Sequence, residues 1–263
     1  MDLTDALDLG PREVVALVGG GGKTTAMYRL CVEAAAKGRR AVASGSARFT
    51  EPFGGATVPL LVDNDESRLA GSVSAALDTQ AWVIAATGRG TRGRLQPLAY
   101  EAIARLAGNT AIGLIALEAD GSAMRAFKAP AEHEPAVPPT ATLVVAVVGA
   151  DIFGRLLTEE AVHRPERVAA LTSAALGDIV TPDIVATVLA HPQGGRKGVP
   201  AGARFAVLVN KVSEARLRDA RSTASLLRER GVQAVVLARV REGQPVVEVL
   251  RPEKPWSPGP TSG

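Results

Sequence analysis

The stretch VVALVGGGGKTT, residues 14–25, decides the fold. Its first five residues form an unbroken apolar run, which predicts a strand buried on both faces. After the four glycines, helix-forming residues continue from Lys23 to Lys37 with apolar positions at helical spacing, and Gly38 ends the segment. The order of strand, glycine turn and helix is typical of an α/β protein.

The glycine turn is predicted to be a P-loop, which binds the phosphates of ATP or GTP. Consecutive glycines let backbone N–H groups point at one anion, and the helix N-terminus adds partial positive charge. The lysine would reach the β- and γ-phosphates, and the first threonine hydroxyl would ligate Mg²⁺. The alternative is a glycine-rich turn with a solvated lysine, because Leu17 occupies the first position of the strict pattern GxxxxGK[ST]. The nucleotide-binding candidates are Gly19, Gly20, Gly21, Gly22, Lys23, Thr24 and Thr25.

Further apolar runs alternate with helix-forming stretches along the chain. We expect strands at 41–43, 82–86, 112–117, 143–148, 205–209 and 234–238, and helices near 65–78, 97–107 and 213–230. This alternation predicts an α/β fold with a mostly parallel sheet flanked by helices, a three-layer sandwich similar to P-loop NTPases. We expect one domain over residues 1–250, inserted loops at 118–140 and 151–203, and a disordered tail at 251–263.

Two predicted strands end in polar residues that could complete a nucleotide site. Glu118 and Asp120 follow one strand, and alternate residues leaving a strand point the same way, so either carboxylate could hold Mg²⁺ and take part in catalysis. Asn210 and Lys211 follow another strand and resemble the base-reading NKxD motif. Ser213 stands in place of its aspartate, so the sequence does not distinguish ATP from GTP.

Composition excludes several classes of protein. The 263 residues are 46% hydrophobic but only 3% aromatic, which leaves little material for stacking on nucleic-acid bases. The formal net charge of +3 is not gathered in one run and favours small anionic ligands. Cys31 is single, which excludes an internal disulfide. With no signal-peptide pattern and no apolar stretch near the roughly 20 residues needed to cross a bilayer, we expect a cytoplasmic protein that binds neither nucleic acid nor membrane.

The histidines and two basic stretches are ambiguous when taken alone. His133, His163 and His191 match no common zinc spacing, and a histidine in a polar loop is more often structural. The basic stretches around Arg89, Arg92 and Arg94 and around Arg196 and Lys197 could hold an anion, although loop charges are usually solvated.

A set of motifs resembles the YqeC family, the accessory proteins of selenium-dependent molybdenum hydroxylases. In chain order the motifs are GGGGKTT, EADGSA, FKAPAEHEP, VVAVVGADIFG, VHRPERVAALT, HPQGGRKGVP and LVNKVS, and they cover roughly residues 14 to 213. The specificity of the resemblance rests on the inserted segments. It implies that these segments carry substrate or partner residues at Lys128, His133, Glu134, His163, Arg164, His191 and Lys197.

The resemblance implies a P-loop protein that uses ATP or GTP with Mg²⁺ to mature a selenium-dependent molybdenum hydroxylase or its cofactor. The partner would be the hydroxylase or a cofactor-modifying enzyme, and the activity would be that of an NTPase or phosphotransferase. Two alternatives remain open. One is a non-enzymatic chaperone whose nucleotide only gates partner binding, and the other is a small-molecule P-loop kinase unrelated to selenium.

Overall fold

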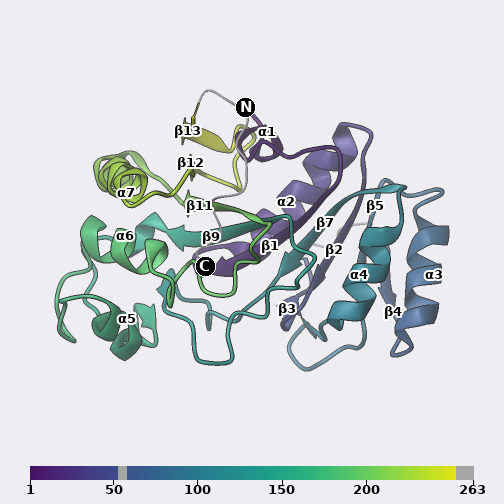
Figure 1. The fold of residues 1–263 in the computed structure, drawn as a ribbon, viewed down its shortest axis with the longest axis horizontal. Helices are drawn as coiled ribbons and strands as arrows, with labels where there is room; N and C mark the ends of the chain where they lie inside the picture. Colours follow the sequence, from purple (N-terminus) through teal and green to yellow (C-terminus); the bar gives the residue numbers. More distant parts are fainter. Residues whose placement is uncertain (53–57, 253–263) are drawn as a thin grey trace.

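A nine-stranded sheet forms the centre of the computed structural model, which describes residues 1–52 and 58–252 (Figure 1). The strand order is β13-β12-β11-β9-β1-β7-β2-β5-β4, and all pairings are parallel except β12 with β13. Its strands are β1 (Glu13–Gly19), β2 (Arg40–Gly45), β4 (Leu60–Val62), β5 (Trp82–Ala86), β7 (Ile112–Glu118), β9 (Leu143–Gly149), β11 (Arg204–Asn210), β12 (Ala234–Ala238) and β13 (Val246–Leu250). The predicted α/β class with a mostly parallel sheet is confirmed.

Helices cover both faces of this sheet and complete three layers. The α-helices are α1 (Leu3–Ala6), α2 (Lys23–Ala36), α3 (Glu66–Ala76), α4 (Tyr100–Gly108), α5 (Pro165–Leu171), α6 (Pro182–Ala190) and α7 (Leu217–Glu229), and the short 3₁₀ turns are η1 (Ala150–Ile152) and η2 (Glu214–Arg216). In Figure 1, α3 and α4 lie over the β5 end of the sheet, while α6 and α7 lie at the β12 end. None of the helices in the described ranges is long and apolar enough to cross a membrane.

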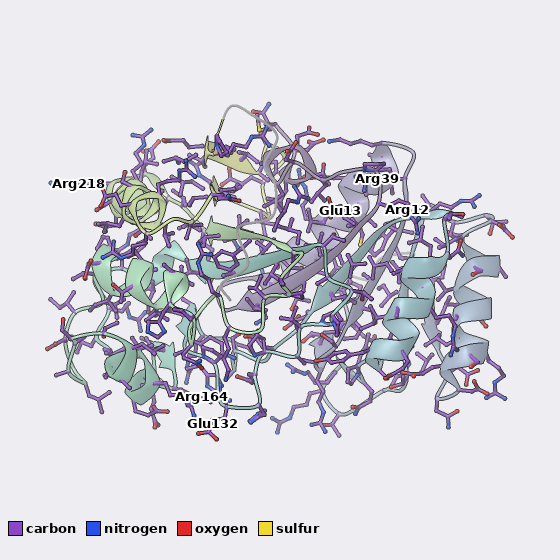
Figure 2. The ribbon with its side chains drawn as sticks, viewed as in Figure 1. Arg12, Glu13, Arg39, Glu132, Arg164 and Arg218 are labelled. Atoms are coloured by element: carbon purple, nitrogen blue, oxygen red, sulfur yellow. The ribbon has the colours of Figure 1, made fainter. Side chains whose placement is uncertain are left out.

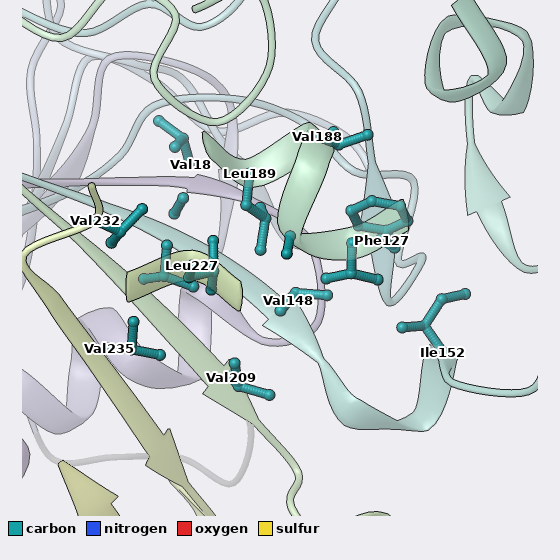
Figure 3. Packing of buried hydrophobic residues seen from close by; sticks show 14 of the residues in the cluster. Val18, Phe127, Val148, Ile152, Val188, Leu189, Val209, Leu227, Val232 and Val235 are labelled. Atoms are coloured by element: carbon teal, nitrogen blue, oxygen red, sulfur yellow. The ribbon is translucent and has the colours of Figure 1, made fainter. Parts of the chain in front are cut away.

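Alternation along β1 explains the layers. Val15 and Leu17 belong to the core beneath α1 and α2, whereas Ala16 and Val18 face the opposite side, in the core shared with α6 and α7. Figure 3 shows this second core. Side chains from three parallel strands meet helix residues there, and examples are Val148, Val209, Val235, Leu189 and Leu227. Both faces of β1 are therefore buried, as its apolar run predicts.

The inserted segments contain more structure than loops. Residues 151–203 include α5, α6 and the short strand β10 (Val162–His163), so the prediction of a loop there is wrong. The sequence hides these helices because they are short and bounded by prolines and glycines. β10 pairs with β8 (Phe127–Lys128) of the other insertion, and a further short pair joins β3 (Phe49–Thr50) to β6 (Arg94–Leu95). The predicted disordered tail lies outside the described residues from position 253 onward.

Candidate functional site

The glycine turn connects the centre of the sheet to α2. β1 lies between β9 and β7, and Gly19 ends it immediately before the turn. Gly19, Gly21 and Gly22 have φ angles of 92°, 77° and 126°, a region that side chains rarely adopt. A Cβ atom on Gly21 would collide with the backbone of Gly149 at the end of β9. The turn therefore needs glycine both for its conformation and for its close packing.

The backbone N–H groups of the turn divide into two sets. The first three are satisfied within the protein, because Gly19 donates to the Asp120 carboxylate, Gly20 to the Val147 carbonyl and Gly21 to the Arg125 carbonyl. The next four, from Gly22 to Thr25, find no acceptor among the residues that the structure describes. They open α2, where unpaired N–H groups and the helix dipole favour an anion.

Four side chains converge beside this helix N-terminus. The Lys23 amino group donates to the Gly19 carbonyl at 2.6 Å and lies 3.2 Å from an Asp120 oxygen and 3.7 Å from a Glu118 oxygen. The Thr24 hydroxyl donates to the Glu118 carboxylate at 2.6 Å. Lys23 and Asp120 are 3% and 2% exposed, so this ion pair is shielded from solvent. Burial raises the pKa of Glu118, although Lys23 and the Thr24 hydroxyl oppose the shift.

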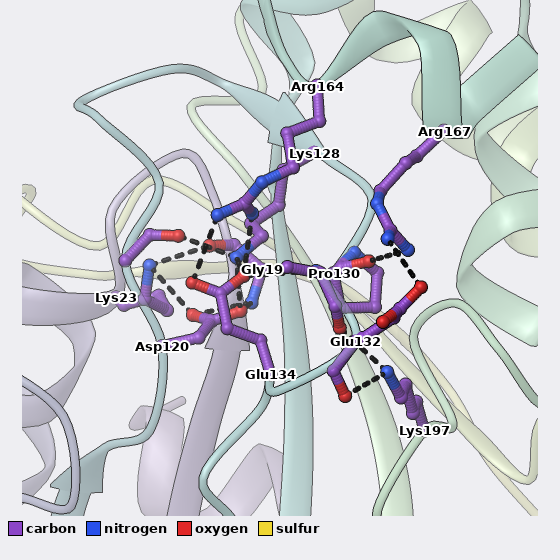
Figure 4. A network of polar contacts seen from close by, with 12 residues as sticks. Gly19, Lys23, Asp120, Lys128, Pro130, Glu132, Glu134, Arg164, Arg167 and Lys197 are labelled. Atoms are coloured by element: carbon purple, nitrogen blue, oxygen red, sulfur yellow. Dashed lines mark hydrogen bonds and ion pairs between the residues drawn. The ribbon is translucent and has the colours of Figure 1, made fainter.

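The cluster continues into the inserted segments (Figure 4). Lys128 lies 3.1 Å from Asp120 and donates to the Gly121 carbonyl and to the Glu134 carboxylate, both at 2.6 Å. Arg164 donates to the same Glu134 oxygen at 2.6 Å. Burial alone would raise the pKa of Glu134, but Lys128 and Arg164 outweigh it and lower that pKa to about 2. An unbroken polar chain thus runs from Lys23 to Arg164.

Asn210 braces the glycine turn from β11. Its amide nitrogen donates to the Gly21 carbonyl at 2.9 Å, and its amide oxygen accepts from the Val240 N–H at 3.1 Å. The neighbouring Lys211 pairs instead with Asp151 at 2.8 Å on the surface. The structure therefore brings Asn210 to the glycine turn, whereas Lys211 points to Asp151 in the segment that follows β9.

The histidines do not form a common cluster. His133 is exposed, and His191 accepts a local hydrogen bond from the Gln193 N–H at its Nδ1 atom. His163 lies in β10 directly beside Lys128, and burial, reinforced by Arg164, lowers its pKa. Across residues 1–52 and 58–252, no three His, Cys, Asp or Glu side chains are placed to hold a metal ion together.

Lys197 joins the two insertions without reaching Lys23. Its amino group donates to the Ala131 and Glu132 carbonyls at 2.7 and 2.9 Å, which ties the segment after α6 to the loop that carries Glu134 (Figure 4). Figure 2 places Glu132 and Arg164 together, far from Glu13 at the start of β1. The inserted segments therefore gather near the carboxyl ends of the central strands, where open parallel sheets bind ligands.

Sequence reasoning missed the backbone part of the site. The carbonyls of Val147 and Arg125, which hold Gly20 and Gly21, carry no side-chain signal. It also missed the pairing of Asp120 with two lysines at once, because the strand-end position predicts only a metal-binding and catalytic role for Asp120. Only the family resemblance indicates Lys128, because no spacing rule predicts it.

Comparison with known proteins places the chain in a family. A family model described as YqeC protein matches residues 15–166, which include most of β1, the glycine turn, Glu118, Asp120 and β10. The chain is also similar to the uncharacterized protein YqeC of Escherichia coli (strain K12), with 30% identity over 246 residues that cover 90% of this chain and 92% of that protein. No solved structure matches the chain significantly. The resemblance carried by the motifs is thus confirmed, and the chain belongs to the YqeC family.

Proposed function

We propose that the protein binds a magnesium complex of ATP or GTP at the glycine turn and transfers or hydrolyses its terminal phosphate. The observation that carries the proposal is the hydrogen bond between the Thr24 hydroxyl and the Glu118 carboxylate. It lies next to four N–H groups at the start of α2 that have no acceptor within residues 1–52 and 58–252. Oxygen donors from a threonine and a carboxylate are the protein ligands that Mg²⁺ takes at phosphate sites.

The residues present fit such a metal. Mg²⁺ usually keeps several waters and needs only one or two protein ligands besides the phosphates, so a cage of three carboxylates is not required. Thr24 and Glu118 would hold it, and the bound metal would neutralise charge on the phosphate oxygens. The N–H groups of Gly22 to Thr25 would bind the phosphates on the other side.

Phosphate binding requires Lys23 to exchange partners. Its amino group donates to the Gly19 carbonyl and forms an ion pair with Asp120. In this pair the Asp120 carboxylate is the anion that a bound phosphate would replace. A phosphate would compete with Asp120 for the lysine, and Asp120 would keep a cation because Lys128 lies 3.1 Å away. The aspartate between two lysines thus lets Lys23 turn to a ligand without leaving a buried carboxylate unpaired.

The first test is calorimetric titration of the protein with Mg-ATP and Mg-GTP. Lys23→Ala should weaken binding about 10- to 100-fold, the range expected for a lost hydrogen bond to a charged group. Lys37→Ala is the matched control, because Lys37 follows the same helix but is exposed and pairs with Asp2 and Asp5. Equal affinity in wild type and Lys23→Ala, with both proteins folded by circular dichroism, would refute phosphate binding at this turn.

We propose further that this chemistry serves the maturation of a selenium-dependent molybdenum hydroxylase or its cofactor. The motif resemblance supports this role, and the inserted segments supply a polar surface beside the nucleotide site. The test is to produce such a hydroxylase in cells with and without the protein and to measure its selenium content and activity. We expect the hydroxylase to lose selenium content and activity in cells without the protein. The wild-type protein should restore both, and Lys23→Ala should restore neither.

A second candidate function is nucleotide-gated binding of a partner without turnover. It is favoured by the polar chain of Figure 4, because a change at Lys23 would reach Arg164 through Asp120, Lys128 and Glu134. Amide exchange of residues 151–203 should then change when a non-hydrolysable ATP analogue binds. Glu134→Gln should abolish that change in exchange without loss of nucleotide affinity. Glu132→Gln, which alters an exposed side chain, should leave the change in exchange intact. Identical exchange in the free and bound wild type would exclude gating.

A further inference from the structure

The short strand that carries Arg94 is anchored to the helix that carries Thr24. In the β3–β6 pair, Arg94 lies opposite Thr50. The Tyr28 hydroxyl donates to the Thr50 carbonyl at 2.7 Å. Tyr28 follows Thr24 by four residues on α2, so both side chains lie on one face of the helix. Arg94 is therefore fixed on the same side of α2 as the proposed metal ligand.

A second set of contacts ties the Arg94 guanidinium to the corner that packs on the end of β7. The N–H groups of Ser46 and Ala47 donate to the Glu118 carbonyl at 3.1 and 3.2 Å, which seats the corner between β2 and β3 directly on the end of β7. Arg94 donates to the carbonyl of Arg48, the next residue of that corner, at 3.0 Å. These hydrogen bonds hold Arg94 at the edge of the sheet where β7 ends in Glu118.

Arg94 keeps most of its hydrogen-bonding capacity. A guanidinium has five N–H donors, and the contact with Arg48 is its one hydrogen bond to the described part of the chain. It has no carboxylate within ion-pair distance there, whereas the nearby Arg89 is neutralised by Glu51 at 2.5 Å. Its side chain is half-buried. A fixed, half-buried and unneutralised arginine is the group that best stabilises negative charge on a phosphoryl group.

We propose that Arg94 is a catalytic residue that contacts the terminal phosphoryl group of the nucleotide, an inference that rests on the proposed function. In hydrolysis, a water oxygen forms a bond to the γ-phosphorus as the bond from phosphorus to the β,γ-bridging oxygen breaks. The bridging oxygen leaves with the electron pair on the nucleoside diphosphate, and the water proton passes to solvent. Arg94 donates hydrogen bonds to the phosphoryl oxygens while this charge is redistributed.

The test is single-turnover hydrolysis of Mg-ATP and Mg-GTP, measured together with nucleotide affinity. Arg94→Ala should lower the rate at least about 100-fold and change Kd less than about threefold, because a residue of this kind acts in the transition state. Arg94→Lys should recover part of the rate by keeping the charge. Arg92→Ala is the control, because Arg92 lies two residues away and is exposed.

The outcomes separate this inference from the proposed function. If the wild type does not bind nucleotide, the proposed function fails, and the inference fails with it. If the wild type binds and hydrolyses nucleotide but Arg94→Ala has the rate of Arg92→Ala, only the role of Arg94 is overturned. If the wild type binds nucleotide without turnover, hydrolysis and the catalytic role of Arg94 both fall while nucleotide binding stands. Binding of ADP with aluminium fluoride provides a second readout, and it should be weakened in Arg94→Ala while ADP alone binds normally.

Discussion

A buried lysine usually destabilises a protein, and Lys23 can be buried because the charged residues around it balance its charge. Each cation in the chain of contacts has a carboxylate neighbour within 4 Å. The cations are Lys23, Lys128 and Arg164, and the anions are Glu118, Asp120 and Glu134. Because removing one member of a buried pair leaves the other uncompensated, substitutions here affect stability as well as ligand binding.

The two candidate carboxylates should therefore respond differently to neutralisation. Glu118→Gln removes the partner of Thr24, and we expect it to lower turnover at least about 100-fold with little change in nucleotide affinity without Mg²⁺. Asp120→Asn removes the one carboxylate that Lys23 and Lys128 share, and we expect it to lower thermal stability more, by about 3 kcal/mol. Phosphate-release assays over a Mg²⁺ titration, with melting curves, distinguish them. Loss of Mg²⁺ dependence in Asp120→Asn alone would transfer the metal role to Asp120.

Among the helices and strands, those with a clear hydrophobic pattern are predicted from the sequence, and those that depend on tertiary contacts are not. The long apolar runs match β1, β5, β7, β9, β11 and β12, because a strand buried on both faces needs apolar residues at every position. β4 and β13 escaped prediction since they lie at the sheet edges and are only partly buried. The helices α5 and α6 have seven and nine residues, too short for a periodic signal to exceed their proline-rich surroundings.

The junction between the glycine turn and β9 should not tolerate a single added methyl group. Gly21→Ala combines a φ of 77° with a collision against the Gly149 backbone, and we expect a loss of about 2–4 kcal/mol in unfolding free energy. Gly71→Ala is the opposite case, because Gly71 lies inside α3 with no atom near the added carbon and should gain about 0.5–1 kcal/mol. Urea denaturation measures both. A Gly21→Ala protein as stable as wild type would contradict the packing of the turn.

The contact between the inserted segments should weaken in acid. The pKa of Glu134 is about 2 in the folded protein against an ordinary 4.5, so folding favours the charged form. The contribution of the Glu134 carboxylate to folding stability is complete above its ordinary pKa and is lost as the pH falls toward 2. We therefore expect the stability difference between wild type and Glu134→Gln, from urea midpoints, to shrink as the pH is lowered from about 6 to about 3. Glu132→Gln, on an exposed side chain, should show no such change.

At the scale of the whole molecule, the site depends on contacts that no local pattern specifies. Gly19 meets Asp120 across 101 residues, and Gly21 meets Asn210 across 189. The sequence placed Glu118, Asp120 and Asn210 at strand ends, and parallel topology then brings those ends to one edge of the sheet. Glu118 and Asp120 reach the glycine turn because β7 lies beside β1, and the sequence does not supply that strand order.

This continuity predicts that residues 1–250 unfold as one unit. β1 pairs with β7 on one side and with β9 on the other, within one uninterrupted sheet. If the strands on either side of β1 unfolded alone, the remaining strands would lose their hydrogen-bonded neighbour. Trp82 in β5 reports on one end of the sheet once Trp256, which lies outside the described residues, is replaced by phenylalanine. A variant with Phe205→Trp and both native tryptophans replaced reports on β11. In each variant the fluorescence midpoint in urea should coincide with the circular dichroism midpoint of the same sample, and two separated transitions would divide the chain into two domains.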